Sequence, residues 1–206
     1  GLGYLTLDRS GLADPLRIKA ELDHYFSQND DPDYITFSGS GEPSLNPHLG
    51  EIIRYIRTLR PGVRVAVLTN GTLLFHPDVR NAMLQAHRVI PSLDAADRRT
   101  FEQINRPCNG LEIESVIEGL AAFSSQYEGE LFLEIFILPG VNDHPESLEA
   151  ICGAVRQIRP DRVQLNTMDR PGTEPGLKPA SKSVLEKMEP LLSGIPVEII
   201  ARVSDQ

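Results

Sequence analysis

Short apolar runs alternate with amphipathic stretches along almost the whole chain, and the two patterns have different periods. Runs such as Tyr34–Phe37 and residues 63–68 are rich in β-branched residues and nearly free of polar ones, which is typical of parallel strands covered on both faces. Stretches such as Pro15–Gln28 repeat apolar residues every three or four positions, which predicts helices with one buried face. The pattern therefore predicts a layered α/β domain.

Strands and helices are expected to alternate about six times. We expect strands at residues 33–37, 63–68, 88–93, 131–138, 162–166 and 197–203, and helices at residues 15–28, 47–59, 77–86, 96–105, 113–127, 146–158 and 183–192. Asn46 is the expected N-cap of the second helix, with Pro47 as its first residue. Short connections imply right-handed crossovers and an all-parallel sheet, either doubly wound and open or a complete or partial barrel. Three prolines and two glycines make residues 169–179 a lid or a surface loop.

Composition narrows the class of protein. A chain of 206 residues that is 40% apolar fits one domain, spanning residues 1–206. Its net charge of -9 argues against a nucleic-acid backbone as the main partner. Two cysteines, Cys108 and Cys152, are too few for a disulfide framework, so we expect a cytoplasmic protein. The apolar run at residues 131–138 is interrupted by Glu134 and is far shorter than the ~20 residues of a spanning helix, so we expect no membrane association.

Small and polar residues gather where the predicted strands end. The five ends are residues 39–42, 69–71, 92–94, 140–143 and 166–170. Ligands of parallel α/β folds bind at the carboxyl ends of the strands, and glycines such as Gly39 and Gly41 let backbone groups approach a ligand closely. Any single loop needs some polar residues, so the prediction of a ligand site rests on their recurrence at several strand ends. The five histidines show no HxH or HExxH grouping, and we expect no metal ligand in this chain.

Four of these segments, in chain order, resemble the radical S-adenosylmethionine (SAM) superfamily. They are Ser38-Gly39-Ser40-Gly41-Glu42-Pro43, Leu68-Thr69-Asn70-Gly71, Ser92-Leu93-Asp94 and Gly140-Val141-Asn142-Asp143. Residues 34–45 and the string at residues 101–107 are similar to a group of stand-alone iron–sulfur oxidoreductases. The resemblance covers nearly the whole chain and implies a partial (β/α)6 TIM-like barrel with parallel strands. It also implies a [4Fe–4S] cluster that binds SAM and cleaves it reductively to a 5′-deoxyadenosyl radical, which takes a hydrogen atom from a substrate.

The resemblance also implies roles for individual residues, although it identifies no catalytic residue. Its cofactor-binding positions are Ser40, Gly41, Glu42, Pro43, Thr69, Asn70, Ser92, Asp94, Glu134, Asn142 and Leu165. The first three would bind the methionyl amino group, Ser92 and Asp94 would hold the ribose hydroxyls, and the backbone near Leu165 would meet the adenine. Glu134 has a second explanation, as an interior carboxylate with a structural partner. Candidates for substrate contact are Arg106, Asn166 and Arg170.

One feature of the family is absent from the sequence, the three-cysteine CxxxCxxC motif that would bind the cluster. Cys108 and Cys152 cannot reproduce this spacing, and a [4Fe–4S] cluster needs thiolate ligands. The chain begins at Gly1 without methionine, so we expect the first strand and the cluster loop to lie upstream and this chain alone to be inactive. The expected partners are a small-molecule substrate and an electron donor.

Two alternatives to the radical SAM function stay open. One is a cluster-free barrel that binds a nucleotide-like ligand or a partner. The other is an unrelated barrel enzyme, which would need a Lys or His at a strand end.

Overall fold

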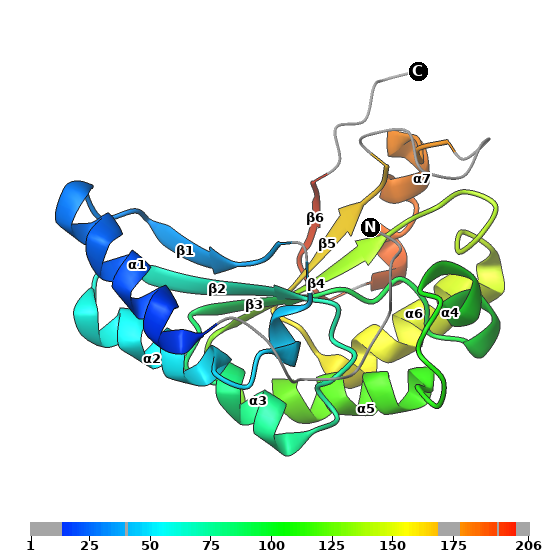
Figure 1. The fold of residues 1–206 in the computed structure, drawn as a ribbon. Helices are drawn as coiled ribbons and strands as arrows, with labels where there is room; N and C mark the ends of the chain where they lie inside the picture. Colours follow the sequence, from blue (N-terminus) through cyan, green and yellow to red (C-terminus); the bar gives the residue numbers. More distant parts are fainter. Residues whose placement is uncertain (1–13, 40, 169–177, 193, 201–206) are drawn as a thin grey trace.

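Six parallel strands form one curved sheet in a computed structural model that describes residues 14–39, 41–168, 178–192 and 194–200 (Figure 1). The strands are β1 (Tyr34–Phe37), β2 (Arg64–Thr69), β3 (Arg88–Pro91), β4 (Glu130–Phe136), β5 (Arg162–Asn166) and β6 (Val197–Ile199). Their order in the sheet follows the chain from β1 to β6. A doubly wound sheet reverses its strand order at a switch point, so this order selects the barrel-type arrangement. The predicted all-parallel α/β fold is confirmed.

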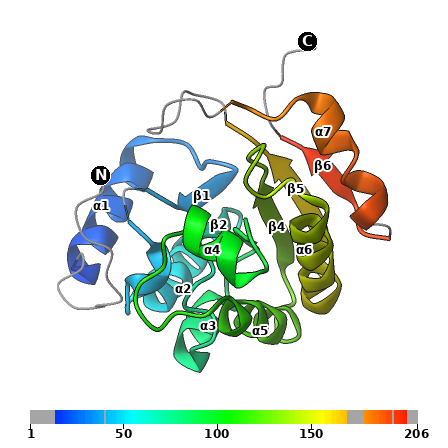
Figure 2. The same cartoon turned by 90° about the vertical axis from the view of Figure 1, so that its right-hand side faces the viewer.

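Helices cover one face of the sheet and leave the other, concave face open (Figures 1 and 2). They are α1 (Pro15–Gln28), α2 (Leu49–Leu59), α3 (Pro77–Met83), α4 (Arg98–Ile104), α5 (Ile113–Ser124), α6 (Pro145–Ile158) and α7 (Lys182–Glu186), with 3-10 turns η1 (Pro43–Leu45) and η2 (Glu189–Leu192). Unlike the outer helices, α4 lies across the carboxyl ends of the strands (Figure 2). No helix in the described part of the chain has both the length and the apolar character needed to span a bilayer.

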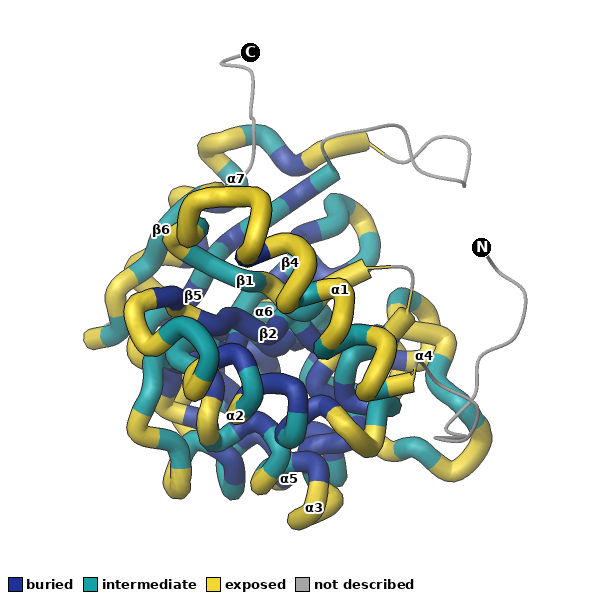
Figure 3. The backbone as a smooth tube through the Cα atoms, turned by 60° about the vertical axis from the view of Figure 1, so that its left-hand side comes forward, coloured by how far each residue is buried: buried dark blue, intermediate teal, exposed yellow. Residues whose placement is uncertain are grey.

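The core lies between the sheet and the outer helices, where the burial colours of Figure 3 are darkest. Alternate strand residues such as Val65, Leu133 and Val163 point into this core and are fully buried. The approach of the layers is close in places: a Cβ at Gly119 of α5 would lie 2.4 Å from the backbone nitrogen of Phe75. Residues between the core positions face the concave side, and many of these are polar.

Several predicted boundaries are corrected by the structure. Asn46 does not cap α2, which begins at Leu49; its side chain instead accepts a hydrogen bond from the His48 nitrogen at 2.9 Å, closing a turn before the helix. The helix predicted at residues 183–192 is divided into α7 and η2, because Pro190 disfavours α-helix at the residue before it. The strand predicted at residues 88–93 ends at Pro91, with one isolated bridge at Ser92, and the strand predicted at residues 131–138 runs from Glu130 to Phe136. Residues 169–177 of the predicted lid lie outside the described residues.

A cluster of charged and aromatic residues covers the amino-terminal part of the concave face. This amino-edge cluster consists of Tyr34, Arg64, Arg88, Glu130, Phe132, Arg162 and Glu198. The Glu130 carboxylate accepts hydrogen bonds from Arg64 at 2.7 Å and from Arg88 at 2.8 Å. The Arg88 guanidinium also lies 4.3 Å from the centre of the Phe132 ring. Every charge of the cluster therefore has an opposite charge beside it.

His87, just before β3, supports the same edge. Its Nδ1 accepts a hydrogen bond from the Val65 backbone nitrogen at 2.9 Å, so this ring nitrogen carries no proton and the imidazole is neutral. Burial lowers the pKa of His87, and the positive charges of Arg57 and Arg64 lower it further, while Glu130 raises it. This histidine thus acts as a backbone-like acceptor beside the β2–β3 ladder.

Candidate functional site

At the opposite, carboxyl edge of the sheet, Glu42 ties the end of β1 to the end of β2. Its carboxylate accepts hydrogen bonds from the backbone nitrogens of Ser44, at 2.9 Å, and Asn70, at 2.7 Å, and from the Thr69 hydroxyl. The glutamate caps η1 through the first of these bonds. The loop before it contains Gly39 at φ 133°, a backbone conformation that favours glycine. The predicted positions Glu42, Thr69 and Asn70 therefore meet.

Asp94 occupies the corresponding place between β3 and β4. Its Oδ1 accepts a hydrogen bond from the Phe136 nitrogen at 3.1 Å, and its Oδ2 lies 3.4 Å from the Asn105 amide at the end of α4. Burial raises the pKa of Asp94 to about 6; these two hydrogen bonds oppose the shift, and the negative charge of Glu134 adds to it. A carboxyl group with a raised pKa at a strand end is a typical feature of a functional site.

Asn142 lies fully buried beneath Asp94. Its amide nitrogen donates to the backbone carbonyls of Asp94, at 2.8 Å, and Phe136, at 2.7 Å. Its amide oxygen accepts from the Leu138 nitrogen at 2.7 Å. The side chain thus joins the loop after β4 to the end of β3.

Glu134 lies on the concave face in the middle of β4. Its Oε1 accepts a hydrogen bond from the Asn166 amide on the neighbouring strand at 3.0 Å. The Asn166 oxygen in turn accepts from the Thr167 nitrogen at 2.8 Å. The substrate candidate Asn166 is therefore placed against a predicted cofactor position, and both are partly exposed.

The three carboxylates of this edge share one electrostatic property. Glu42, Asp94 and Glu134 are held by neutral hydroxyl and amide groups, and none of the ion pairs formed within the described residues includes them. A carboxylate of a charged pair is compensated locally, whereas these three leave negative charge facing the open end of the sheet. The edge is therefore suited to a cationic group or to hydroxyl donors.

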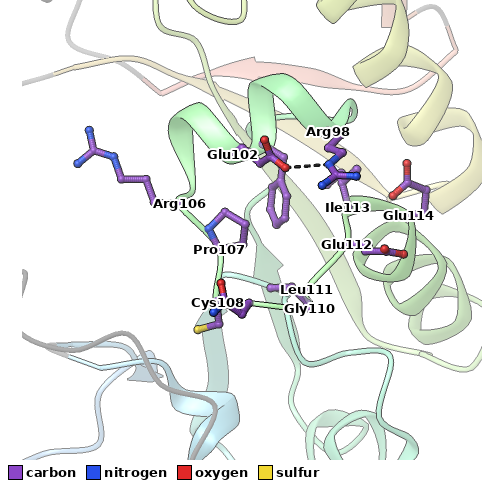
Figure 4. Close-up of a pocket in the computed structure, with 12 residues that line it drawn as sticks. Arg98, Glu102, Arg106, Pro107, Cys108, Gly110, Leu111, Glu112, Ile113 and Glu114 are labelled. Atoms are coloured by element: carbon purple, nitrogen blue, oxygen red, sulfur yellow. Dashed lines mark hydrogen bonds and ion pairs between the residues drawn. The ribbon is translucent and has the colours of Figure 1, made fainter.

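A pocket of about 610 Å³ adjoins this edge beside α4, the loop after it and the start of α5 (Figure 4). Phe101 and Ile113 contribute apolar surface, and Arg98 pairs with Glu102 across one turn of α4 at 2.8 Å. Cys108 and Arg106 also line it. Asn105, which directly precedes the lining residue Arg106, lies 3.4 Å from the Asp94 carboxylate and so relates the pocket to the site in the chain.

The remaining predicted positions are distributed more widely. Ser92 pairs with Glu134 in an isolated bridge, so it lies within the site. Leu165 is fully buried in the core, and its carbonyl already accepts from the Ile200 nitrogen at 3.0 Å. Ser40 and Arg170 lie outside the described residues. The sequence did not single out Asn105, although it belongs to the string at residues 101–107.

The described residues do not fit an iron–sulfur cluster. No group of three or more His, Cys, Asp or Glu residues in that part of the chain could hold a metal ion. Cys108 is half-buried in a loop, whereas Cys152 is buried in α6, where burial raises the pKa of its thiol. A thiolate set is therefore not among these residues.

Sequence comparisons give a family match and several relatives. The profile of the "Radical SAM superfamily" matches residues 6–151. The chain is 38% identical over 167 residues to a "GTPase Obg" of Brachyspira hyodysenteriae, covering 81% of this chain and 24% of that protein. It is 35% identical over 174 residues to a "UPF0026 protein" of Helicobacter pylori strain J99, covering 84% and 56%. A "GTP 3',8-cyclase" of Nostoc punctiforme is 35% identical over 106 residues, 50% of this chain and 32% of that protein. The match thus spans 24% of the length of the first of these relatives and 56% of the second.

Two solved structures share the fold. A domain of a pyruvate-formate lyase-activating enzyme from Bacteroides vulgatus superposes with a TM-score of 0.62 at 18% identity, over 80% of this chain and 97% of that one. A radical SAM methyltransferase from Sphaerobacter thermophilus gives a TM-score of 0.64 at 17% identity, over 91% and 56%. At these identities the likeness concerns the fold, and it agrees with the predicted TIM-like barrel.

Proposed function

Because the chain belongs to the radical SAM superfamily, we propose that it is the SAM-binding barrel of a radical SAM oxidoreductase that acts on a small-molecule substrate. We further propose that residues 1–206 belong to a single domain of this type. The observation that carries the proposal is a set of three carboxylates that are held by neutral donors: Glu42 after β1, Asp94 after β3 and Glu134 within β4.

The charge of this edge supports SAM rather than a phosphate as the ligand. SAM carries a sulfonium and an ammonium group, and carboxylates without a cation partner attract both. A phosphate would be repelled by the same groups and is usually bound by Lys, Arg or a helix N-terminus. The ribose of SAM adds hydroxyl donors, which the Asp94 carboxylate can accept.

Each residue at the edge has a proposed task. Glu42 places the loop after β1, so that the backbone around Gly41 faces the ammonium group; a Cβ at Gly41 would meet nothing within 4 Å, so this side of the loop is open. Asp94 accepts the ribose hydroxyls. Glu134, oriented by Asn166, faces the reacting end of the ligand or the substrate.

The cluster is proposed to be held by thiolates outside the described residues, since these offer no suitable set. Such a cluster, once reduced, would supply the electron that cleaves SAM, and the products would support hydrogen-atom abstraction from a substrate. An electron donor is then a required partner. Two free cysteines agree with a reducing cytoplasm as the compartment.

The test is anaerobic reconstitution of the full natural protein with iron and sulfide, beside the 206-residue chain. We expect thiolate-to-iron charge-transfer absorbance in the full protein and none in this chain alone. Calorimetric titration of the reconstituted protein with SAM should then show binding that Glu42→Gln weakens about tenfold, because the variant removes the charge and loosens the β1–β2 bridge.

The matched control is Glu51→Gln, a glutamate on α2 that pairs with Lys19 away from the strand ends. It should leave the affinity for SAM unchanged. A full protein that forms no cluster would remove the radical mechanism and favour the alternative, a barrel that binds a nucleotide-like ligand or a partner. SAM binding that is equal in both glutamate variants would remove the assigned site.

A further inference from the structure

Resting on the proposed function, we propose that Asn142 is a positioning residue: it fixes Asp94 for the ligand hydroxyls by bridging β3 and β4 beyond the end of their backbone ladder, and it does not touch the ligand. The resemblance to the family gave Asn142 a direct contact with the cofactor. Its place in the structure supports the indirect role instead.

The backbone pairing of β3 and β4 is short. Their register contains two residue pairs, Arg88 with Glu130 and Val89 with Leu131, followed by the isolated bridge between Ser92 and Glu134. The last backbone hydrogen bond recorded between them runs from the Leu93 nitrogen to the Glu134 carbonyl at 2.9 Å. Past this point, side chains make the cross-strand bonds in the described structure.

Two side chains replace the ladder there. The Asp94 carboxylate accepts a hydrogen bond from the Phe136 nitrogen at 3.1 Å, and the Asn142 amide nitrogen donates to the carbonyls of Asp94 and Phe136. We call this pair of side-chain bridges the Asn142 clasp. A carboxamide has two donor hydrogens, and both of those on Asn142 are used. Because the residue is also fully buried, it has neither a free donor nor a surface for a ligand.

These bonds of the Asn142 clasp leave one carboxylate oxygen of Asp94 accessible to a ligand. The carbonyl of Asp94 is held by Asn142 and its Oδ1 by Phe136. Its Oδ2 is 3.4 Å from the Asn105 amide, a distance at which a hydrogen bond is weak. A ribose hydroxyl could therefore displace Asn105 without disturbing either stronger bond.

The electrostatic state of Asp94 depends on the same clasp. Burial is the main reason that the pKa of Asp94 rises to about 6, and the electrostatic effect of Glu134 adds to the shift. If the Asn142 side chain is removed, the ends of β3 and β4 separate and water reaches the carboxyl group. Its pKa should then fall toward the ordinary value of 3.8.

The first experiment follows the side-chain carboxyl carbon of Asp94 by NMR during a pH titration of the 206-residue chain. We compare the wild type with Asn142→Ala, with Asn142→Ser, which keeps one donor, and with Asn29→Ala as control. Asn29 caps α1 through a 2.8 Å bond to the Tyr25 carbonyl, far from the site in the chain. We expect the Asp94 titration to move about one pH unit lower in Asn142→Ala, less in Asn142→Ser, and not in Asn29→Ala.

The second experiment measures binding of 5′-methylthioadenosine to the reconstituted full protein, because this compound has the ribose hydroxyls but no amino acid group. Asn142→Ala should weaken binding about tenfold and should also reduce the preference for this compound over its 2′-deoxy analogue. A residue with only a structural role would lower stability without changing that preference.

The outcomes separate the two proposals. If the wild type binds no 5′-methylthioadenosine, the proposed function fails, while the Asp94 titration still judges the clasp. An unchanged titration and an unchanged preference in Asn142→Ala would overturn the positioning role. If Asn142→Ala does not fold, the test is made on the wild type, by following the Phe136 amide resonance during the pH titration. We expect this resonance to shift as Asp94 titrates. A resonance that does not depend on pH would overturn the proposal.

Discussion

The two edges of the sheet treat charge in opposite ways. At the amino edge, Glu130 is paired with two arginines, and the aromatic rings of Tyr34 and Phe132 cover the guanidinium groups. At the carboxyl edge, Glu42 and Asp94 are held only by neutral donors within the described residues. The two edges also differ in burial: the Glu130 side chain is 39% exposed, whereas Asp94 is buried deeply enough to raise the pKa of its carboxyl group.

The comparison separates carboxylates that are paired with arginine from carboxylates that are held by neutral groups, which we propose to bind a ligand. A carboxylate with a fixed arginine partner has its field cancelled, and it adds little to ligand binding. A carboxylate with neutral partners keeps its field, and burial makes its ionisation costly until a ligand compensates it. The raised pKa of Asp94 is the sign of this second state.

Of the substitutions that test this comparison, Phe132→Ala at the amino edge should change the free energy of unfolding most. The ring is 8% exposed and lies 4.3 Å from the Arg88 guanidinium and 5.2 Å from that of Arg162. Its loss should lower the free energy of unfolding by about 4 kcal/mol, measured by urea denaturation, because a buried ring and two cation–π contacts disappear. Phe132→Leu should lose less, since it keeps most of the apolar volume. A loss in Phe132→Ala smaller than that of Phe132→Leu would contradict the stabilising role of this edge.

At the carboxyl edge, Asp94→Asn should raise the free energy of unfolding, whereas Phe132→Ala at the amino edge lowers it. The folded pKa of about 6 lies above the ordinary 3.8, so the stability that Asp94 contributes is present below the ordinary value and is lost as pH rises through about 6. The variant should therefore gain stability relative to the wild type between pH 4 and pH 8, by about 3 kcal/mol at most. Denaturation at both pH values measures this gain. A difference that does not change with pH would show that the carboxyl group is not desolvated.

A smaller and opposite pH dependence is expected at the amino edge. The pKa of His87 is lowered, so its stabilising bond to the Val65 nitrogen is present above the ordinary value and is lost as pH falls through the folded one. His87→Leu should cost about 1 kcal/mol of unfolding free energy near pH 8, and the cost should shrink on acidification. Thermal unfolding across this range measures it, with His24→Gln on the exposed side of α1 as control. A cost that grows toward low pH would exclude the neutral-acceptor role.

Periodicity predicted the elements better than their ends. The bounds of α1 and β5 agree with the sequence pattern, because each begins and ends where the apolar period does. The start of α2 was wrong, since Asn46 and Pro47 satisfy the general rule for a helix start while η1 occupies the preceding turn. Such a competition between two local turns depends on the packing of the loop, which a linear pattern does not contain.

The site was partly predictable for a related reason. Parallel strands end at one edge, so residues such as Thr69 and Asp94 were expected at the same edge once the strands were identified. Which polar groups pair there depends on the directions of the side chains, and Asn105 therefore escaped notice. The amino-edge cluster left a clearer signal: Arg64, Arg88 and Arg162 are each the first residue of their strand.

The order of the strands also bears on how the two side-chain bridges can form. Every strand neighbours the strands before and after it in the chain, so the Glu42 bridge and the Asn142 clasp each join adjacent β/α units. The entropy lost on closing a loop grows only with the logarithm of its length, and closures between successive units keep that loss small. The proposed binding edge, which draws on several described β/α units, can thus form through a series of local closures.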